Sequence, residues 1–226
     1  SELSTNLGFL LGGSLLAQTL RYAPFIGAQL LATPAQKDMV AEFIVGLFLA
    51  RIPILMFQAV QAALLPKLAH LAGSGQHDDF RTGVRKLIAV VVSIAVIGVI
   101  AAGTLGPAVG EILFGAKFTL GNVDLALLAA GSGLFILALT LAQALIALLG
   151  HARALIAWSI GLVMFVAVTA ATGPDLFRRV EYGYIAGTGA AALTMGIMLY
   201  FRARAGVPED GLATLVEQIE HEPLEI

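Results

Sequence analysis

The stretch LIAVVVSIAVIGVIAAGTL, residues 87–105, contains no charged residue and no proline. A helix that crosses a bilayer needs about 20 consecutive apolar residues, and this stretch supplies nearly all of them. It lacks the alternation of polar and apolar residues that is typical of barrel strands, so a helix is the expected spanning element. The stretch therefore predicts a transmembrane helix.

Similar apolar runs lie on both sides of this stretch and are joined by short segments. The whole chain is 58% hydrophobic and 12% charged, whereas soluble proteins carry roughly 25% charged residues. We therefore predict an all-α membrane protein in which residues 1–205 form one bundle. The six predicted spans cover residues 7–31, 40–66, 87–106, 125–149, 153–172 and 182–201. The glycine-rich residues after the third span are predicted to form a loop on the outer side with a short interfacial or re-entrant piece.

The positive residues between the spans predict the orientation of the chain. Seven of them fall on one side of the bundle: Lys67, Arg81, Arg85, Lys86, Arg153, Arg202 and Arg204. Four fall on the other: Lys37, Lys117, Arg178 and Arg179. The positive-inside rule then places the first side, and both termini of the chain, in the cytoplasm of a multi-pass protein of the cytoplasmic membrane. Residues 206–226 contain six acidic residues and no lysine or arginine, and they are predicted to form a solvated cytoplasmic tail.

The composition also excludes several kinds of site. The chain contains no cysteine, so disulfides and thiol chemistry are excluded. A net charge of −2 argues against a nucleic-acid partner. His151 stands alone in its turn, which does not favour a metal site. We expect no metal ion and no cofactor.

Two arginines lie deep inside apolar runs: Arg21 in the first and Arg51 in the second. A charge in the bilayer is costly, so an intramembrane arginine is a functional-site hypothesis. No acidic residue is predicted in the middle of a span, and the nearest is Glu42, close to a span end. Cations without carboxylates predict an anionic substrate.

Glutamines accompany both arginines. Gln18 precedes Arg21 by three residues, so the two share a helical face. Gln58 follows Arg51 by seven residues and lies nearly in register with it, and Gln61 flanks that face. We interpret these five residues as lining one cavity. The alternative is that neighbouring carbonyls and glutamines satisfy the arginines for structural reasons.

Each deep arginine also lies beside a proline that is expected to kink its helix. Pro24 follows Arg21, and Pro53 follows Arg51. A proline inside a helix leaves a carbonyl one turn earlier without its partner and bends the axis. Bent helices often line transporter sites near the middle of the membrane. This pattern places the expected cavity at that depth.

Three motifs carry a resemblance to a known family. They are ARIPILMFQAVQAALLPKLA at residues 50–69, LFGAKF at 113–118 and LGHAR at 149–153. Over about residues 7–200 the chain resembles the C-terminal half of polysaccharide-lipid flippases. These belong to the MATE-like superfamily, which includes the Wzx-type O-antigen flippases and the lipid II flippases. Such proteins have two pseudosymmetric halves, so the resemblance implies one lobe of a two-lobed flippase. Its partner would be a missing N-terminal half or a second subunit.

The resemblance implies a function as well as a fold. A flippase of this kind would move an isoprenoid diphosphate-linked oligosaccharide or cell-wall precursor across the membrane, and would not be an enzyme. Arg21 and Arg51 would hold the diphosphate, since a guanidinium binds phosphate through two parallel hydrogen bonds. Gln18, Gln58 and Gln61 would contact sugar hydroxyls. Membrane lipids and the anionic lipid-linked glycan are the expected partners.

Three other functions remain open at this point. A multidrug exporter of the same superfamily would share the fold, but its cationic substrates require buried acids. A polyprenyl-phosphate glycosyltransferase would need acidic residues on an outer loop, and only Asp38 lies in the first one. A membrane assembly subunit that transports nothing is the third possibility.

Overall fold

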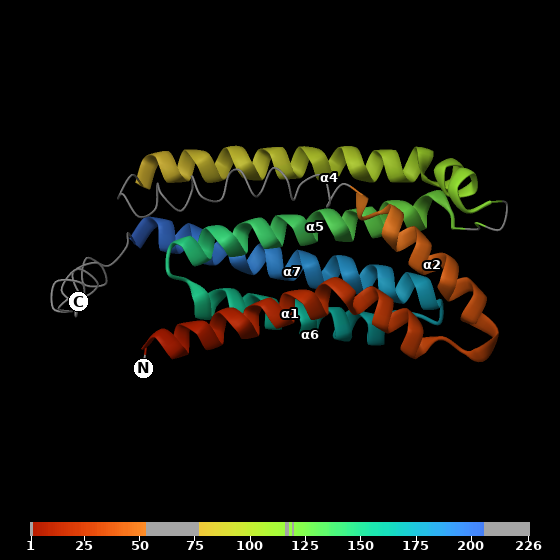
Figure 1. Cartoon of the computed structure of the whole chain (residues 1–226), viewed down its shortest axis with the longest axis horizontal. Helices are drawn as coiled ribbons and strands as arrows, with labels where there is room; N and C mark the ends of the chain where they lie inside the picture. Colours follow the sequence, from red (N-terminus) through yellow and green to blue (C-terminus); the bar gives the residue numbers. More distant parts are fainter. Residues whose placement is uncertain (1, 53–76, 116–117, 119, 206–226) are drawn as a thin grey trace, which may run out of the picture.

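The computed structural model describes residues 2–52, 77–115, 118 and 120–205, and it contains no strand within them. The elements run roughly along one axis, except α2, which crosses it obliquely (Figure 1). They are α1 (Glu2–Leu31), the short 3-10 helix η1 (Pro34–Gln36), α2 (Lys37–Leu49), α4 (His77–Phe114), α5 (Asn122–Ala147), α6 (His151–Ala171) and α7 (Leu176–Ala205).

Four of these helices, α4 to α7, are long and apolar enough to cross a membrane. The prediction of an all-helical fold is confirmed for the described residues, and four of its helices are candidates for spanning a membrane. The predicted spans 125–149, 153–172 and 182–201 correspond to α5, α6 and α7. α1 has 30 residues but is not among the four candidates. The predicted span 40–66 is described only as far as residue 52, so the count of six spans stays a prediction.

α4 is longer than predicted. Instead of ending at residue 106, it is one helix of 38 residues that continues through Pro107. Residues 107–114, which were predicted to belong to the outer-side segment with an interfacial or re-entrant piece, are therefore a continuation of α4. Asp78 and Asp79 in the first turn favour an early start, because negative charge stabilises a helix N-terminus. The proline bends the helix without ending it, and the last turns of α4 point in a new direction (Figure 1).

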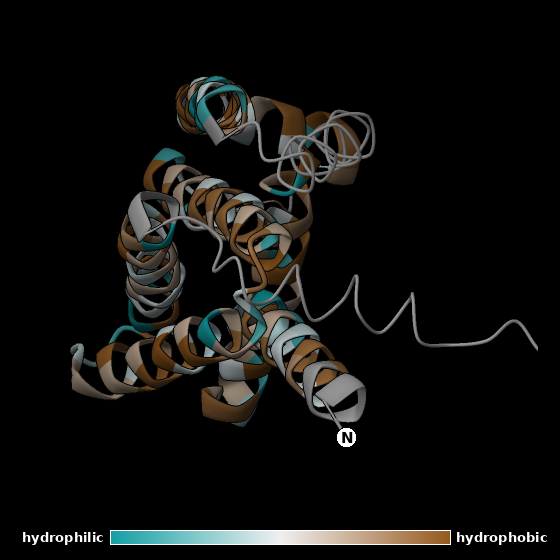
Figure 2. Cartoon of the chain, turned by 90° about the vertical axis from the view of Figure 1, so that its left-hand side faces the viewer, coloured by the Kyte–Doolittle hydropathy of each residue, from teal (hydrophilic) through white to brown (hydrophobic). Residues whose placement is uncertain are grey.

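α5 lies in the middle of the bundle, between α4 on one side and α7 on the other, and α6 and α1 pack next to α7 (Figures 1 and 2). The backbones of α6 and α7 approach each other closely. A Cβ atom on Gly187 would lie 2.7 Å from the carbonyl oxygen of Gly161, and one on Gly183 would overlap Thr169. Small residues at four-residue spacing thus let the two backbones meet, as membrane helices often do.

Replacing Gly187 with alanine is expected to destabilise the bundle by about 1–3 kcal/mol, the usual range for overpacking. The added methyl group would meet backbone, which cannot move without separating α6 from α7. Gly189→Ala is the matched control, since its Cβ would lie 3.6 Å from Leu134, an ordinary contact. Unfolding of the two variants in mixed detergent would measure the difference. Equal stability of both variants would contradict the close approach.

The apolar core consists of two clusters of buried residues. Helices α1, α5 and α7 each contribute one part of their length to the first cluster and the other part to the second. In α5 the boundary lies between Ala129 and Phe135, and in α7 between Val180 and Tyr184. In α1 the core residue Ala23 belongs to the first part and Ala28 to the second. The polar side chains described next lie near this boundary.

Candidate functional site

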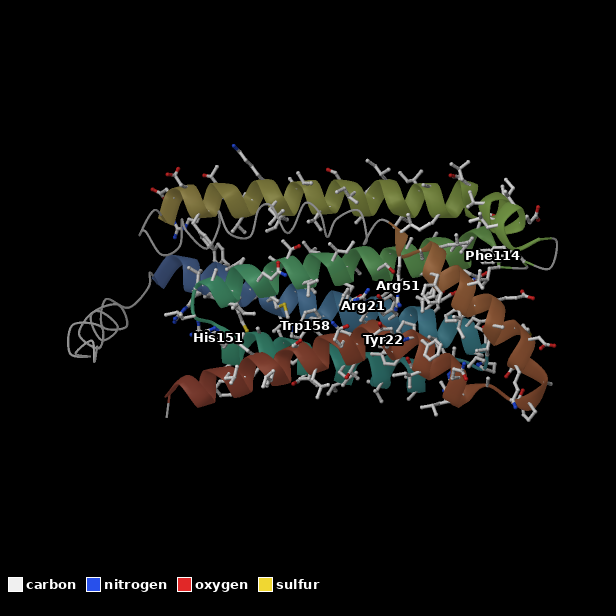
Figure 3. All side chains as sticks on the ribbon, viewed as in Figure 1. Arg21, Tyr22, Arg51, Phe114, His151 and Trp158 are labelled. Atoms are coloured by element: carbon white, nitrogen blue, oxygen red, sulfur yellow. The ribbon has the colours of Figure 1, made fainter. Side chains whose placement is uncertain are left out.

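The structure brings the two deep arginines together. The terminal nitrogen Nη2 of Arg51 donates a hydrogen bond to the backbone carbonyl of Arg21. The guanidinium carbons of Arg21 and Arg51 lie 5.8 and 5.6 Å from the centre of the Tyr22 ring. Figure 3 shows the three residues side by side where α2 reaches α1. Arginines from two different segments therefore form one cluster.

The local sequence explains how this contact arises. α2 ends at Leu49, and Pro53 has no N–H to donate to the Leu49 carbonyl, so the sequence favours an end there. Arg51 then lies in the turn, where its backbone N–H bonds to Phe48 at 3.1 Å. In α1, Pro24 has no N–H to bond to Leu20, which loosens the ladder beside the Arg21 carbonyl.

Two hydroxyl groups complete the cluster from the other side. Tyr184 in α7 is fully buried, and Ser132 in α5 is 1% exposed. The Tyr184 hydroxyl has Ser132, Arg51 and Arg21 as its polar neighbours. Tyr184 is therefore a packing residue of the bundle interior rather than an exposed residue at a helix end. We call Arg21, Arg51, Ser132 and Tyr184 the polar cluster.

The polar cluster contains hydrogen-bond donors that have no acceptor. Nε of Arg21, Nε of Arg51, Oγ of Ser132 and the Tyr184 hydroxyl are all buried without a hydrogen-bond partner. A buried polar group left unpaired costs about 1–3 kcal/mol. Guanidinium groups can only donate, and hydroxyls can donate as well. Because both guanidinium groups carry positive charge, the ligand that suits such a cluster best is an anion with acceptor oxygens.

The polar cluster lies well inside the bundle. Ser132 is ten residues from the start of α5, which corresponds to about 15 Å along the helix. Tyr184 is eight residues from the start of α7, or about 12 Å. A hydrocarbon core is about 30 Å thick, so this depth is beyond the reach of the headgroups if the helices cross the membrane. Arg51 is packed rather than open to a wide cavity, since only 8% of it is exposed.

The predicted glutamines are not part of the described cluster. Gln18 lies one turn before Arg21 and is exposed on the surface of α1. Gln58 and Gln61 lie outside the described residues. Their predicted contacts with sugar hydroxyls stay a prediction.

A buried carboxylate lies one turn away from Tyr184, which the sequence did not lead us to expect. Glu181 in α7 is fully buried and pairs with Arg178 at 3.3 Å. Arg178 also pairs with Asp124 of α5 at 3.2 Å. The sequence did not place Glu181 in a span, because α7 begins at Leu176 rather than at residue 182. The side chain of Asp175 extends the helix by accepting hydrogen bonds from the N–H groups of its first turn.

No family model, curated protein or solved structure matches the chain. The resemblance to flippases therefore stays a prediction that rests on the motifs quoted above. Among the described residues, no group of three or more histidine, aspartate or glutamate side chains could hold a metal ion. The polar cluster is consequently the feature from which a function can be argued.

Proposed function

We propose that the chain forms a six-helix lobe of a flippase that moves an isoprenoid diphosphate-linked oligosaccharide or cell-wall precursor across the cytoplasmic membrane. The single observation that supports this function most is the polar cluster. It gathers buried donors from α1, α5, α7 and the turn after α2, and it leaves them without an acceptor.

A diphosphate complements this arrangement chemically. Its oxygens accept hydrogen bonds and carry negative charge, whereas Arg21 and Arg51 offer planar forks of donors with fixed positive charge. Placing the diphosphate against two guanidinium groups offsets the cost of bringing its charge into the bilayer. The isoprenoid tail can remain in lipid throughout, so only the polar part needs a protein path.

The burial of Arg51 is consistent with a transporter whose binding site holds no substrate. A substrate would have to displace the contact between Arg51 and the Arg21 carbonyl, which joins the region after α2 to α1. Alternating access moves one group of helices against another around a fixed site. We propose that α1 and α2 move relative to α5 and α7, and that a second lobe covers the opposite side of the site.

A cationic substrate is less well supported by the same residues. Glu181 is a buried acid near the polar cluster, but it already pairs with Arg178. Its other oxygen, Oε1, is buried without a partner, but the unpartnered groups of the polar cluster itself are two guanidinium nitrogens and two hydroxyls. This balance of charge favours an anion over a cationic drug.

A flipping assay tests the proposed function. The full-length protein would be reconstituted in liposomes with a fluorescent isoprenyl diphosphate sugar, and the label in the outer leaflet would be bleached with a membrane-impermeant reductant. We expect the protected label to cross within the assay only when the protein is present. A neutral analogue without the diphosphate should not cross. Equal movement of the neutral analogue would contradict an anion-specific transporter.

Replacing Tyr184 with phenylalanine is expected to weaken diphosphate binding by about tenfold, the usual effect of losing one hydrogen bond to a charged group. Phenylalanine keeps the ring that packs on Gly131, so the bundle should remain folded. Tyr182→Phe is the matched control, because Tyr182 is 45% exposed. A titration of both variants with a soluble isoprenyl diphosphate gives the comparison. An unchanged affinity in Tyr184→Phe would show that this hydroxyl does not face the ligand.

A further inference from the structure

Two adjoining cavities lie on the outside of the bundle, away from Arg21 and Arg51 of the polar cluster. Residues of α4, α5 and α7 line them. The first has a volume of about 620 Å³ and lies along α5 and α7. The second has a volume of about 380 Å³ and lies between the start of α4 and the end of α7. Gly196 and Tyr200 line both cavities, so the two cavities adjoin at these residues, and we call the pair the groove.

The first cavity is apolar in its lining. Leu134 and Leu137 of α5 form one wall, and Leu193 and Ile197 of α7 form the other. Glycine at position 196 leaves room in the groove, and the nearest atom to a Cβ there would be 3.8 Å away. Leu193 is 67% exposed even though it lines the cavity. This space suits a hydrocarbon chain.

The second cavity combines apolar residues with two arginines. Arg81 and Arg85 lie one turn apart on α4 and line the cavity together with Val84 and Ile88. Arg81 also makes an ion pair of 3.7 Å with Asp78, whose side chain is 99% exposed. Ion pairs that are this exposed are weak, so the pair can yield to a stronger anion. The lining therefore suits a negatively charged group attached to an apolar body.

The arginines lie at the level where headgroups would be expected. α4 begins at His77 and α7 ends at Ala205, so Arg81 and Arg85 lie near the end of the bundle that Figure 2 faces. Tyr200 and Phe201 lie near the same end, are 52% and 65% exposed, and have ring centres 5.6 Å apart. Exposed aromatic residues near the ends of spanning helices are typical of the membrane interface.

We propose that this groove binds an anionic phospholipid of the surrounding membrane. The phosphate headgroup lies against Arg81 and Arg85, and one acyl chain lies in the apolar cavity along α5 and α7. The site is separate from the polar cluster, and it does not depend on what the protein transports. Net negative charge distinguishes its ligand from a zwitterionic lipid, whose phosphate is balanced by a cation in the same headgroup.

The experiment measures which lipid occupies the groove. The chain contains no cysteine, so Leu193→Cys provides a single site in it for a fluorophore. The labelled full-length protein would be placed in phosphatidylcholine bilayers that contain a small fraction of nitroxide-labelled phosphatidylglycerol or nitroxide-labelled phosphatidylcholine. Because the nitroxide quenches only nearby fluorophores, the extent of quenching reports the occupancy of the groove by each lipid.

We expect phosphatidylglycerol to bind at least about fivefold better than phosphatidylcholine, the order expected from one arginine at the membrane surface. The double variant Arg81→Ala and Arg85→Ala should lose this preference. Arg153→Ala, which removes an exposed arginine at the start of α6, should keep it. Equal quenching by the two lipids in the wild type, or a preference that survives in the double alanine variant, would overturn the proposal.

A second double variant keeps the test decisive if the alanine variant fails to fold. Arg81→Lys and Arg85→Lys retain the charge, so the preference for phosphatidylglycerol should persist. Loss of the preference in this lysine variant, with quenching by phosphatidylcholine unchanged, would also overturn the proposal. Unchanged quenching by phosphatidylcholine serves as the measure of an intact groove in every variant.

Discussion

Replacing Arg51 with alanine is expected to slow transport of an isoprenyl diphosphate sugar by about 30-fold or more, which corresponds to about 2 kcal/mol or more for a buried charge contact. The reason is that Arg51 supplies both a fixed charge and an unpartnered Nε donor inside the bundle. Its removal would leave the negative charge of the substrate with one guanidinium instead of two. The flipping assay described above measures the rate, and the amount of inserted protein normalises it.

Two further variants separate the charge from the shape of the side chain. Arg51→Lys should retain part of the activity, because an ammonium group keeps the charge but lacks the planar fork. Arg153→Ala should transport like the wild type, since Arg153 is exposed and lies outside the polar cluster. Wild-type transport by Arg51→Ala, at normal abundance, would contradict a role of Arg51 in binding the substrate.

Replacing Arg178 with alanine is expected to destabilise the bundle by about 2–4 kcal/mol, since breaking a buried pair leaves an uncompensated charge. Glu181 is the residue at risk, because its side chain is fully buried and Arg178 is the cation that pairs with it. The side chain of Arg178 is itself 31% exposed, so we place the effect below the upper limit for buried pairs. Unfolding in mixed detergent at neutral pH would measure the loss.

The second substitution in this test is Glu181→Gln. Adding it to Arg178→Ala should recover much of the lost stability, because a neutral amide does not need a cation. Arg179→Ala is the matched control on the same helix. Arg179 donates to the Thr169 carbonyl at 2.9 Å, so its loss should cost only about 1 kcal/mol. If Arg178→Ala were no less stable than Arg179→Ala, the ion pair would not stabilise the fold.

The sequence was sufficient to predict α5, α6 and α7, because each is a long apolar run between polar turns. It was insufficient for the ends of α4 and α7. Both helices begin with charged residues in or near their first turns, so hydropathy alone placed the starts of the predicted spans too far along the chain. Asp78 and Asp175 stabilise these polar turns, which is a local effect that an average over a window does not detect.

The candidate site was predictable only in part. Depth and charge singled out Arg21 and Arg51, and the structure places them in contact. Ser132 and Tyr184 gave no such signal, because a lone hydroxyl in an apolar run is also common in packed helices. Their proximity to the arginines depends on how α5 and α7 meet.

The burial of the arginines could not be predicted from the sequence. Arg51 is 8% exposed, and Arg21 is partly covered. The crossing of α2 over the bundle brings Arg51 against α1, and the spacing of residues within each helix could not reveal that crossing (Figure 1).

The central claim is that the polar cluster binds the diphosphate of a lipid substrate. The most direct test is a calorimetric titration of the full-length protein in lipid nanodiscs with a short isoprenyl diphosphate and, separately, with the corresponding isoprenyl alcohol. We predict saturable binding of the diphosphate alone, weakened by about 30-fold or more in Arg51→Ala, as expected for the loss of a buried charge contact. Equal binding of the alcohol, or wild-type affinity for the diphosphate in Arg51→Ala, would contradict the account.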